Sequence, residues 1–185
     1  MDRILITTPT GNVGLATLRQ LAKHPNRPNL TLVAGVLPGN ALPELKIRVV
    51  NVVDLLKLQH HTDHPHGLTD ADYNALFTAD KPVIFAFHGY PWLVHRLTYN
   101  RANNPHMHVH GYREEGTITT AFDMTVLNKL DRFHLVMNLL GRLPQLGNRG
   151  AYLVQHLKDK LIDHKRYIRM NGEEMPGIRD WTWKP

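Results

Sequence analysis

The sequence contains no cysteine. Disulfide bonds and zinc or iron–sulfur sites with cysteine ligands are therefore excluded, and a chain without thiols suits the reducing cytoplasm, where we expect it to reside. The sequence also lacks an apolar run long enough to cross a bilayer, so no membrane partner is expected. Near the N-terminus Thr7, Thr8 and Thr10 interrupt the first apolar stretch, which therefore does not resemble a signal peptide.

Long runs of like charge are absent as well. The formal net charge is +6 and the chain carries 13 histidines, but no basic run is longer than Lys165-Arg166. A basic protein attracts nucleic acids and phosphorylated metabolites. A nucleic-acid surface, however, needs lysines and arginines clustered on one face, so nucleic-acid binding is disfavoured.

The order of apolar segments predicts the fold class. The length of 185 residues and the apolar content of 42% fit one globular domain over residues 1–185. Strand-like runs lie at residues 4–6, 30–36, 47–53, 81–88 and 107–112. Helix-like segments lie at residues 13–23, 91–99, 120–140 and 148–170, and a further helix is expected to begin at Thr69. This alternation predicts a three-layer α/β/α fold, Rossmann-like, with a mostly parallel five-stranded sheet.

Single residues mark where several of these helices begin. Thr69 is suited to cap a helix that continues with two aspartates, and Pro91 fits a first helical turn. Thr119 or Thr120 is expected to cap the helix over residues 120–140, which Asp131 would restart.

Histidines are dense in two places, residues 60–66 and residues 106–110. A metal ion needs ligands that converge on one point, whereas alternate residues of a strand lie about 7 Å apart. The loop at residues 60–66 could wrap a cation, but we interpret both groups as loop and surface histidines and assign no metal site.

The stretch after residues 81–87 is the most site-like. Ligands of parallel α/β sheets bind beyond the carboxyl ends of the strands. His88 and Gly89 stand at such an end, and Arg96 follows on the next helix. We therefore predict a possible anion site of His88, Gly89 and Arg96. The structural alternative is that Gly89 makes the turn while Tyr90 and Trp92 cover the end of the sheet.

No catalytic residue is assigned, because the sequence offers no nucleophile or carboxylate pair near His88. Glu114 and Glu115 are adjacent, so their side chains are expected to point apart in a solvated loop. Asp131 and Arg132 could form an ion pair across a domain or subunit boundary.

The opening of the chain resembles a nucleotide-binding turn. In TTPTGNVG, Gly11 and Gly14 match the second and third glycines of the dinucleotide fingerprint, but Thr8 replaces the first. Residues 1–36 are similar to the start of the NmrA-like NAD(P)-binding family. Gly11 and Gly14 are thus weak candidates for cofactor binding. Binding of NAD(P) itself is not expected, because no acidic or basic residue follows residues 30–36 to bind the ribose or its phosphate.

Residues 42–183 resemble the C-terminal domain of the phosphoketolase family. The segments that carry the resemblance are LPELKIRVVNVVDLLKLQ, HPHGLTDADYNALFTADKPVIFAFHGYPWLVHRLTYNR, HVHGYREEGTITTAFDMTVLNKLDRFHLV and IRDWTW. The resemblance implies a transketolase-C-terminal-like fold. It also implies an enzyme that uses thiamine diphosphate and Mg²⁺, held between two preceding domains, to make acetyl phosphate from xylulose 5-phosphate or fructose 6-phosphate.

The resemblance implies a structural, dimer-assembling domain or fragment that is inactive alone and binds no cofactor itself. Its partners would be the remaining phosphoketolase domains or another copy. Residues 1–40 then form an atypical β-α-β opening from a fusion, a misjoined fragment or a chimera. The alternatives are a small NAD(P)-binding NmrA-like oxidoreductase module and a phosphate-sensing domain. A separated domain would expose a former interface, with Trp92, Trp181 and Trp183 as its expected exposed groups.

Overall fold

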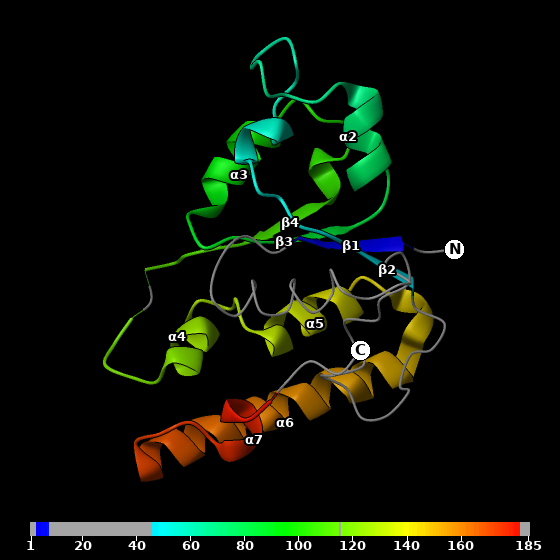
Figure 1. The fold of residues 1–185 in the computed structure, drawn as a ribbon. Helices are drawn as coiled ribbons and strands as arrows, with labels where there is room; N and C mark the ends of the chain where they lie inside the picture. The colour runs from blue at the N-terminus through cyan, green and yellow to red at the C-terminus, as the bar shows by residue number, and fades with distance from the viewer. Residues whose placement is uncertain (1–2, 8–45, 115, 182–185) are drawn as a thin grey trace. The chain divides into compact units, whose positions relative to one another are not determined.

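The computed structural model describes residues 3–7, 46–114 and 116–181. These residues form two compact units, which are described separately: residues 3–7 and 46–112 make the first, and residues 113–114 and 116–181 make the second. Figure 1 shows the elements of both units. The single domain over residues 1–185 and its three layers stay predictions.

The first unit contains a four-stranded parallel sheet. Its strands are β1 (Arg3–Thr7), β2 (Lys46–Val50), β3 (Val83–Ala86) and β4 (Met107–His110), in the order β2-β1-β3-β4. The parallel α/β class is thereby confirmed. The described residues show four strands where five were predicted, and the predicted strand at residues 30–36 lies outside them, as does the predicted helix at residues 13–23.

Strand β1 occupies the middle of this sheet. Leu5 is in register with Arg48 of β2 on one side and with Val83 of β3 on the other. The neighbours of β1 are therefore about 40 and 80 residues away along the chain, and the sheet depends on long-range pairing.

Two helices and two short 3₁₀ segments complete the first unit: η2 (Leu55–Leu58), α2 (Asp70–Phe77), α3 (Pro91–Thr98) and η3 (Asn104–His106). Helix α2 begins as predicted, because the Thr69 side chain accepts a hydrogen bond from the backbone N–H of Asp72 at 3.1 Å. Pro91 stands in the first turn of α3, also as predicted. Figure 1 shows α2 and α3 on the same face of the sheet.

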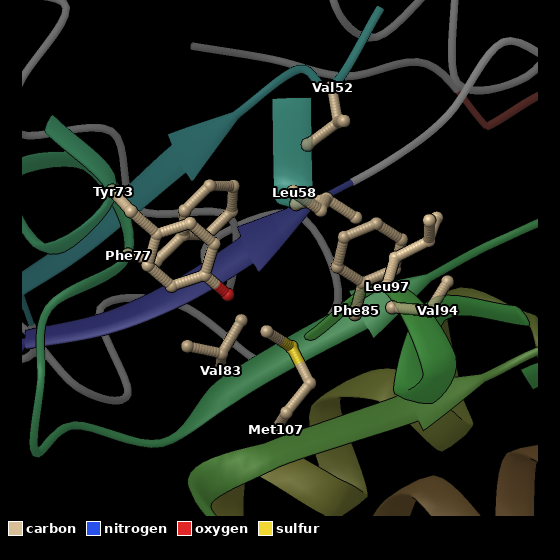
Figure 2. Packing of buried hydrophobic residues seen from close by; sticks show 9 residues of the cluster. All are labelled: Val52, Leu58, Tyr73, Phe77, Val83, Phe85, Val94, Leu97 and Met107. Atoms are coloured by element: carbon tan, nitrogen blue, oxygen red, sulfur yellow. The ribbon is translucent and has the colours of Figure 1, made fainter. Parts of the chain in front are cut away.

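The core of the first unit lies between that face and the helices. Figure 2 shows nine of its side chains, which come from the sheet, η2, α2, α3 and residue 52: Val52, Leu58, Tyr73, Phe77, Val83, Phe85, Val94, Leu97 and Met107. The rings of Tyr73 and Phe77 lie 4.7 Å apart. Ile84, which alternates with Val83 and Phe85, is fully buried too, so β3 is buried on both faces as its unbroken apolar sequence indicates.

Strand β2 is shorter than predicted. The run of β-branched residues extends to Val53, but the strand ends at Val50. Val52 turns into the core and Val53 is exposed, while the Asp54 side chain accepts a hydrogen bond from the N–H of Leu56 and caps η2. The β-branched residues alone would continue the strand to Val53, but the chain instead turns toward the 3₁₀ segment that Asp54 caps.

The second unit is helical: α4 (Ala121–Leu127), α5 (Arg132–Leu140), η4 (Pro144–Leu146), α6 (Gly147–Asn171) and α7 (Pro176–Arg179). Thr120 caps α4 and Asp131 caps α5, which confirms the predicted restart. On α6 the buried residues are Gly150, Leu153, Leu157 and His164. Helix α7 was not predicted.

Candidate functional site

The carboxyl ends of β3 and β4 are joined beyond the strands themselves. The backbone N–H of Phe87 donates to the carbonyl of His110 at 2.8 Å, and the N–H of Tyr112 donates to the carbonyl of Gly89 at 2.7 Å. The segments that follow the two strands therefore run side by side, and the backbone of the predicted site is held by its neighbour.

Gly89 and Gly111 permit this close approach. A Cβ atom on Gly111 would lie 2.4 Å from the carbonyl oxygen of Gly89, and one on Gly89 would lie 2.4 Å from the Phe87 ring. No other residue fits at Gly111 without a backbone shift, because its neighbour there is a main-chain atom. Next to the glycines, the rings of Tyr90 and Tyr112 meet edge to face at 5.8 Å.

His88 and Arg96 are both exposed beside this turn. Within residues 3–7, 46–114 and 116–181, neither side chain makes a hydrogen bond or an ion pair. Tyr90 and Trp92 are exposed as well, so they do not seal His88 beneath them. The anion site of His88, Gly89 and Arg96 stays a prediction.

The described strand order has a switch point at β1. Strands β2 and β3 lie on opposite sides of β1, although all four strands are parallel. Ligands of open parallel sheets bind at the carboxyl ends of the strands at such a switch point. Thr7 ends β1 and Ala86 ends β3, two residues before His88. Gly11 and Gly14 lie outside the described residues, and their cofactor role stays a prediction.

Three of the histidines at residues 60–66 use a ring nitrogen in contacts with their own loop or with Asp54. His60 Nδ1 contacts Thr62 Oγ1 at 2.7 Å, His66 Nδ1 contacts the Asp54 carboxylate at 2.8 Å, and His64 Nδ1 accepts from the N–H of His66. Across the described residues, no group of three or more histidine, aspartate or glutamate side chains could hold a metal ion.

Arg101 fastens this loop to the first unit, a role that the sequence did not reveal. Its side chain is almost fully buried, and its Nε donates to the carbonyl of Leu58 at 3.0 Å. The two terminal nitrogens reach the Asp70 carboxylate at 2.7 Å and the carbonyls of Gln59 and Leu68. The guanidinium also stacks 4.2 Å from the centre of the Tyr73 ring. All five groups lie at residues 58–73, far from Arg101 in the sequence, so only the fold brings the guanidinium to them.

The second unit contains a buried carboxylate. Asp123 on α4 is fully buried, and its Oδ2 accepts hydrogen bonds from Thr119 at 2.6 Å and from Lys165 at 2.7 Å. Burial alone would raise the pKa of Asp123, but the hydrogen bonds from Lys165 and Thr119 outweigh it and hold the pKa below its ordinary value. The ion pair fastens α4 to α6.

His164 lies beside this pair on α6. The residue is fully buried, its ring packs edge to face against Phe122 at 5.2 Å, and neither ring nitrogen has a hydrogen-bond partner in the described part of the chain. Burial lowers the pKa of His164, and the charge of Asp123 opposes that effect only in part. His164 is therefore a neutral imidazole inside the unit.

Within the described residues Asp131 and Arg132 do not pair with each other, and an ion pair across a domain or subunit boundary stays a prediction. The Asp131 carboxylate caps α5 through the N–H groups of Phe133 and His134 and contacts the His134 ring. Arg132 instead stacks within 5 Å of three rings of its own unit, those of Phe122, Phe133 and Trp181. Burial lowers the pKa of Arg132 to about 10.

Glu114 is exposed, and its backbone φ of 57° places it in the left-handed region. Glu115 lies outside the described residues. The solvated loop expected before α4 is thus confirmed at the one glutamate that the structure describes.

None of the helices in the described residues is both long and apolar enough to span a membrane.

Comparison with known proteins gives a consistent picture. Residues 29–183 match the family model of the XFP C-terminal domain. A probable phosphoketolase of Nitrosospira multiformis is 64% identical over 153 residues, which are 83% of this chain and 19% of the relative. Probable phosphoketolase 2 of Nostoc is 60% identical over 83% of this chain and 19% of its own length. A probable phosphoketolase of Clostridium acetobutylicum is 58% identical over 88% of this chain and 20% of its own length.

The chain therefore spans about a fifth of the length of these relatives. The match begins at residue 29, earlier than the residue 42 that the sequence resemblance indicated. Strand β1, at residues 3–7, lies before it. With a matching family model over most of its residues and relatives at this level of identity, the chain belongs to the phosphoketolase family and carries that family's C-terminal domain.

Proposed function

We propose that this chain is a structural and assembly domain of a phosphoketolase and has no activity of its own. The observation that carries the proposal is the extent of the match, because 83% of the chain corresponds to only 19% of the Nitrosospira relative. The family resemblance implies that thiamine diphosphate and Mg²⁺ bind between domains that precede this one. The partners are then those domains, or a second copy of the assembled enzyme.

The internal contacts support a structural role. Arg101 and Asp123, which are buried, and Lys165, which is half-buried, each bond to neighbours within their own unit. Groups engaged in this way stabilise helices and loops, and they have few donors or acceptors left for a substrate.

The test measures acetyl phosphate from xylulose 5-phosphate and inorganic phosphate. The purified chain should produce none and should bind no thiamine diphosphate with Mg²⁺ in a calorimetric titration. A chimera in which residues 29–183 replace the matching part of the Nitrosospira relative should produce acetyl phosphate. Product formed by the chain alone, or a folded chimera without activity, would contradict the proposal.

The NAD(P)-binding alternative rests on one observation, that β1 lies in the middle of the parallel sheet and leads toward Gly11. Since Thr8 replaces the turn glycine, we expect NADH to bind weakly or not at all. A fluorescence titration that shows micromolar affinity, lost on Gly11→Val, would make the oxidoreductase alternative the better one.

A further inference from the structure

One face of α3 carries large aromatic and basic side chains in contact with solvent. Trp92, His95, Arg96 and Tyr99 are exposed and recur at helical spacing, so they lie on one side of the helix. Trp92 and Tyr99 keep 62% and 65% of their surface exposed. The opposite side of α3, with Val94 and Leu97, packs into the core.

Two further aromatic residues extend this surface. Tyr90 immediately precedes α3, and its ring contacts that of Tyr112. Both tyrosines are exposed. We call this set of six residues the α3 face: Tyr90, Trp92, His95, Arg96, Tyr99 and Tyr112.

The α3 face differs from an ordinary solvated helix surface. No aspartate or glutamate lies between Tyr90 and Arg101. Helix α2, on the same side of the sheet, instead exposes Asp70, Ala71 and Asp72. Interface centres are enriched in tryptophan, tyrosine and arginine and depleted of acidic side chains, and these aromatic and arginine residues carry most of the binding energy. The composition of the α3 face is that of a contact surface.

We propose that the α3 face is the surface on which the preceding domains of a phosphoketolase dock. This proposal rests on the proposed function. It identifies the surface through which the domain contacts the rest of the enzyme. About four fifths of the length of the relatives lies outside their match to this chain, so a large partner is available. A second copy of this chain would bring its own charge of +6, and like charges oppose such pairing.

The chemistry of the face defines its partner. Trp92 and Tyr99 require an apolar surface that covers their rings, and Arg96 requires a carboxylate that its planar group can bind in two places. The docking partner is therefore an apolar protein surface that bears acidic side chains.

Hydroxyl-radical labelling of the chimera described above tests this proposal. Oxidation of Trp92 and Tyr99 should fall several-fold in the chimera relative to the free chain. Tyr152 on α6, which is 67% exposed, serves as the matched control and should be labelled equally in both. In the chimera, Trp92→Ala combined with Tyr99→Ala should lower the recovery of assembled enzyme, whereas Tyr152→Ala should not.

The outcomes separate this proposal from the proposed function. Equal labelling of Trp92 in an active chimera overturns the docking surface and leaves the proposed function standing. Protection in an inactive chimera supports the docking surface and counts against the proposed function. Protection of the free chain at low concentration and low salt that equals the protection in the chimera would assign the α3 face to a second copy. Protection of the free chain by added single-stranded DNA would assign it to a nucleic acid. Either result would overturn the proposal.

Discussion

Arg101 concentrates many interactions of the first unit in one side chain. It donates hydrogen bonds to three backbone carbonyls and one carboxylate. Its guanidinium also stacks on the Tyr73 ring. We predict that Arg101→Lys destabilises the chain by roughly 3 kcal/mol. An ammonium cannot reproduce the planar fork, and the carbonyls left without donors are costly when buried.

Urea denaturation measures the effect of Arg101→Lys. Arg166→Lys, at an exposed position on α6, is the control and should change the free energy of unfolding by less than about 0.5 kcal/mol. Equal, small changes for the two variants would show that the charge of Arg101 matters and the fork does not.

His88 remains the residue to examine for anion binding. It is exposed beyond β3, and Arg96 is exposed on the next helix. If phosphate or sulfate binds this chain at the carboxyl end of β3, we expect the ring signals of His88 to shift in an NMR titration. Shifts confined to lysines, with the His88 signals unmoved, would remove the site from consideration.

The residues that sequence reasoning missed share one property. Arg101 and His164 act through groups far away in sequence, whereas scattered basic residues and a histidine among helical apolar positions look ordinary in the sequence. Local signals were more informative: Gly89 was expected at the turn and lies there, where an added Cβ would come 2.4 Å from the Phe87 ring.

At the scale of elements, the segments after β3 and β4 depend on Gly111. We predict that Gly111→Ala lowers the free energy of unfolding by about 1–3 kcal/mol, because the added methyl group would press on the carbonyl of Gly89. Gly177→Ala is the matched control, since nothing lies within 4 Å of its added Cβ. Thermal unfolding of both variants compares them, and an unchanged midpoint for Gly111→Ala would contradict the close approach.

The stability that the packing of α4 against α6 contributes should depend on pH through His164. Its pKa is lowered from 6.5 in the folded state, so the unfolded chain takes up the proton first as the pH falls. The stability associated with neutral His164 is complete above about pH 7 and is lost as the pH falls through the ordinary histidine value toward the folded one.

Denaturation at about pH 7.5 and about pH 5.5 tests this dependence. In His164→Phe, which keeps a ring against Phe122, the loss of stability on acidification should be smaller than in the parent chain. His156→Gln, on the same helix, should retain the parent's dependence. An unchanged slope in His164→Phe would assign the acid sensitivity to other groups.

Elements with local signals were the ones predicted best. Thr69, Thr120 and Asp131 cap helices where the sequence placed them, because a cap is decided within a few residues. The end of β2 and the short helix α7 depend on packing and were missed. On α6, the burial of His164 was not predicted, because a polar residue does not reveal its burial by type.

For the whole molecule, we predict that the isolated chain self-associates at high concentration. Trp92 is exposed as expected, whereas Trp181 is half-buried against Arg132 and Trp183 lies outside the described residues. Exposed aromatic surface drives association even against a like charge when salt screens it. Light scattering should therefore report association in salt that weakens in Trp92→Ala, and a strictly monomeric parent chain would contradict the prediction.

The position of β1 makes the described sheet depend on residues outside the matched part of the chain. Its five residues precede the part of the chain that matches the family, yet they form the only link between β2 and β3 in the described sheet. The sheet of the matched domain is here bridged by a strand that lies outside the match, held by backbone hydrogen bonds that any extended segment without proline can make. Side-chain substitutions that keep β1 extended should therefore leave its hydrogen bonds to β2 and β3 in place.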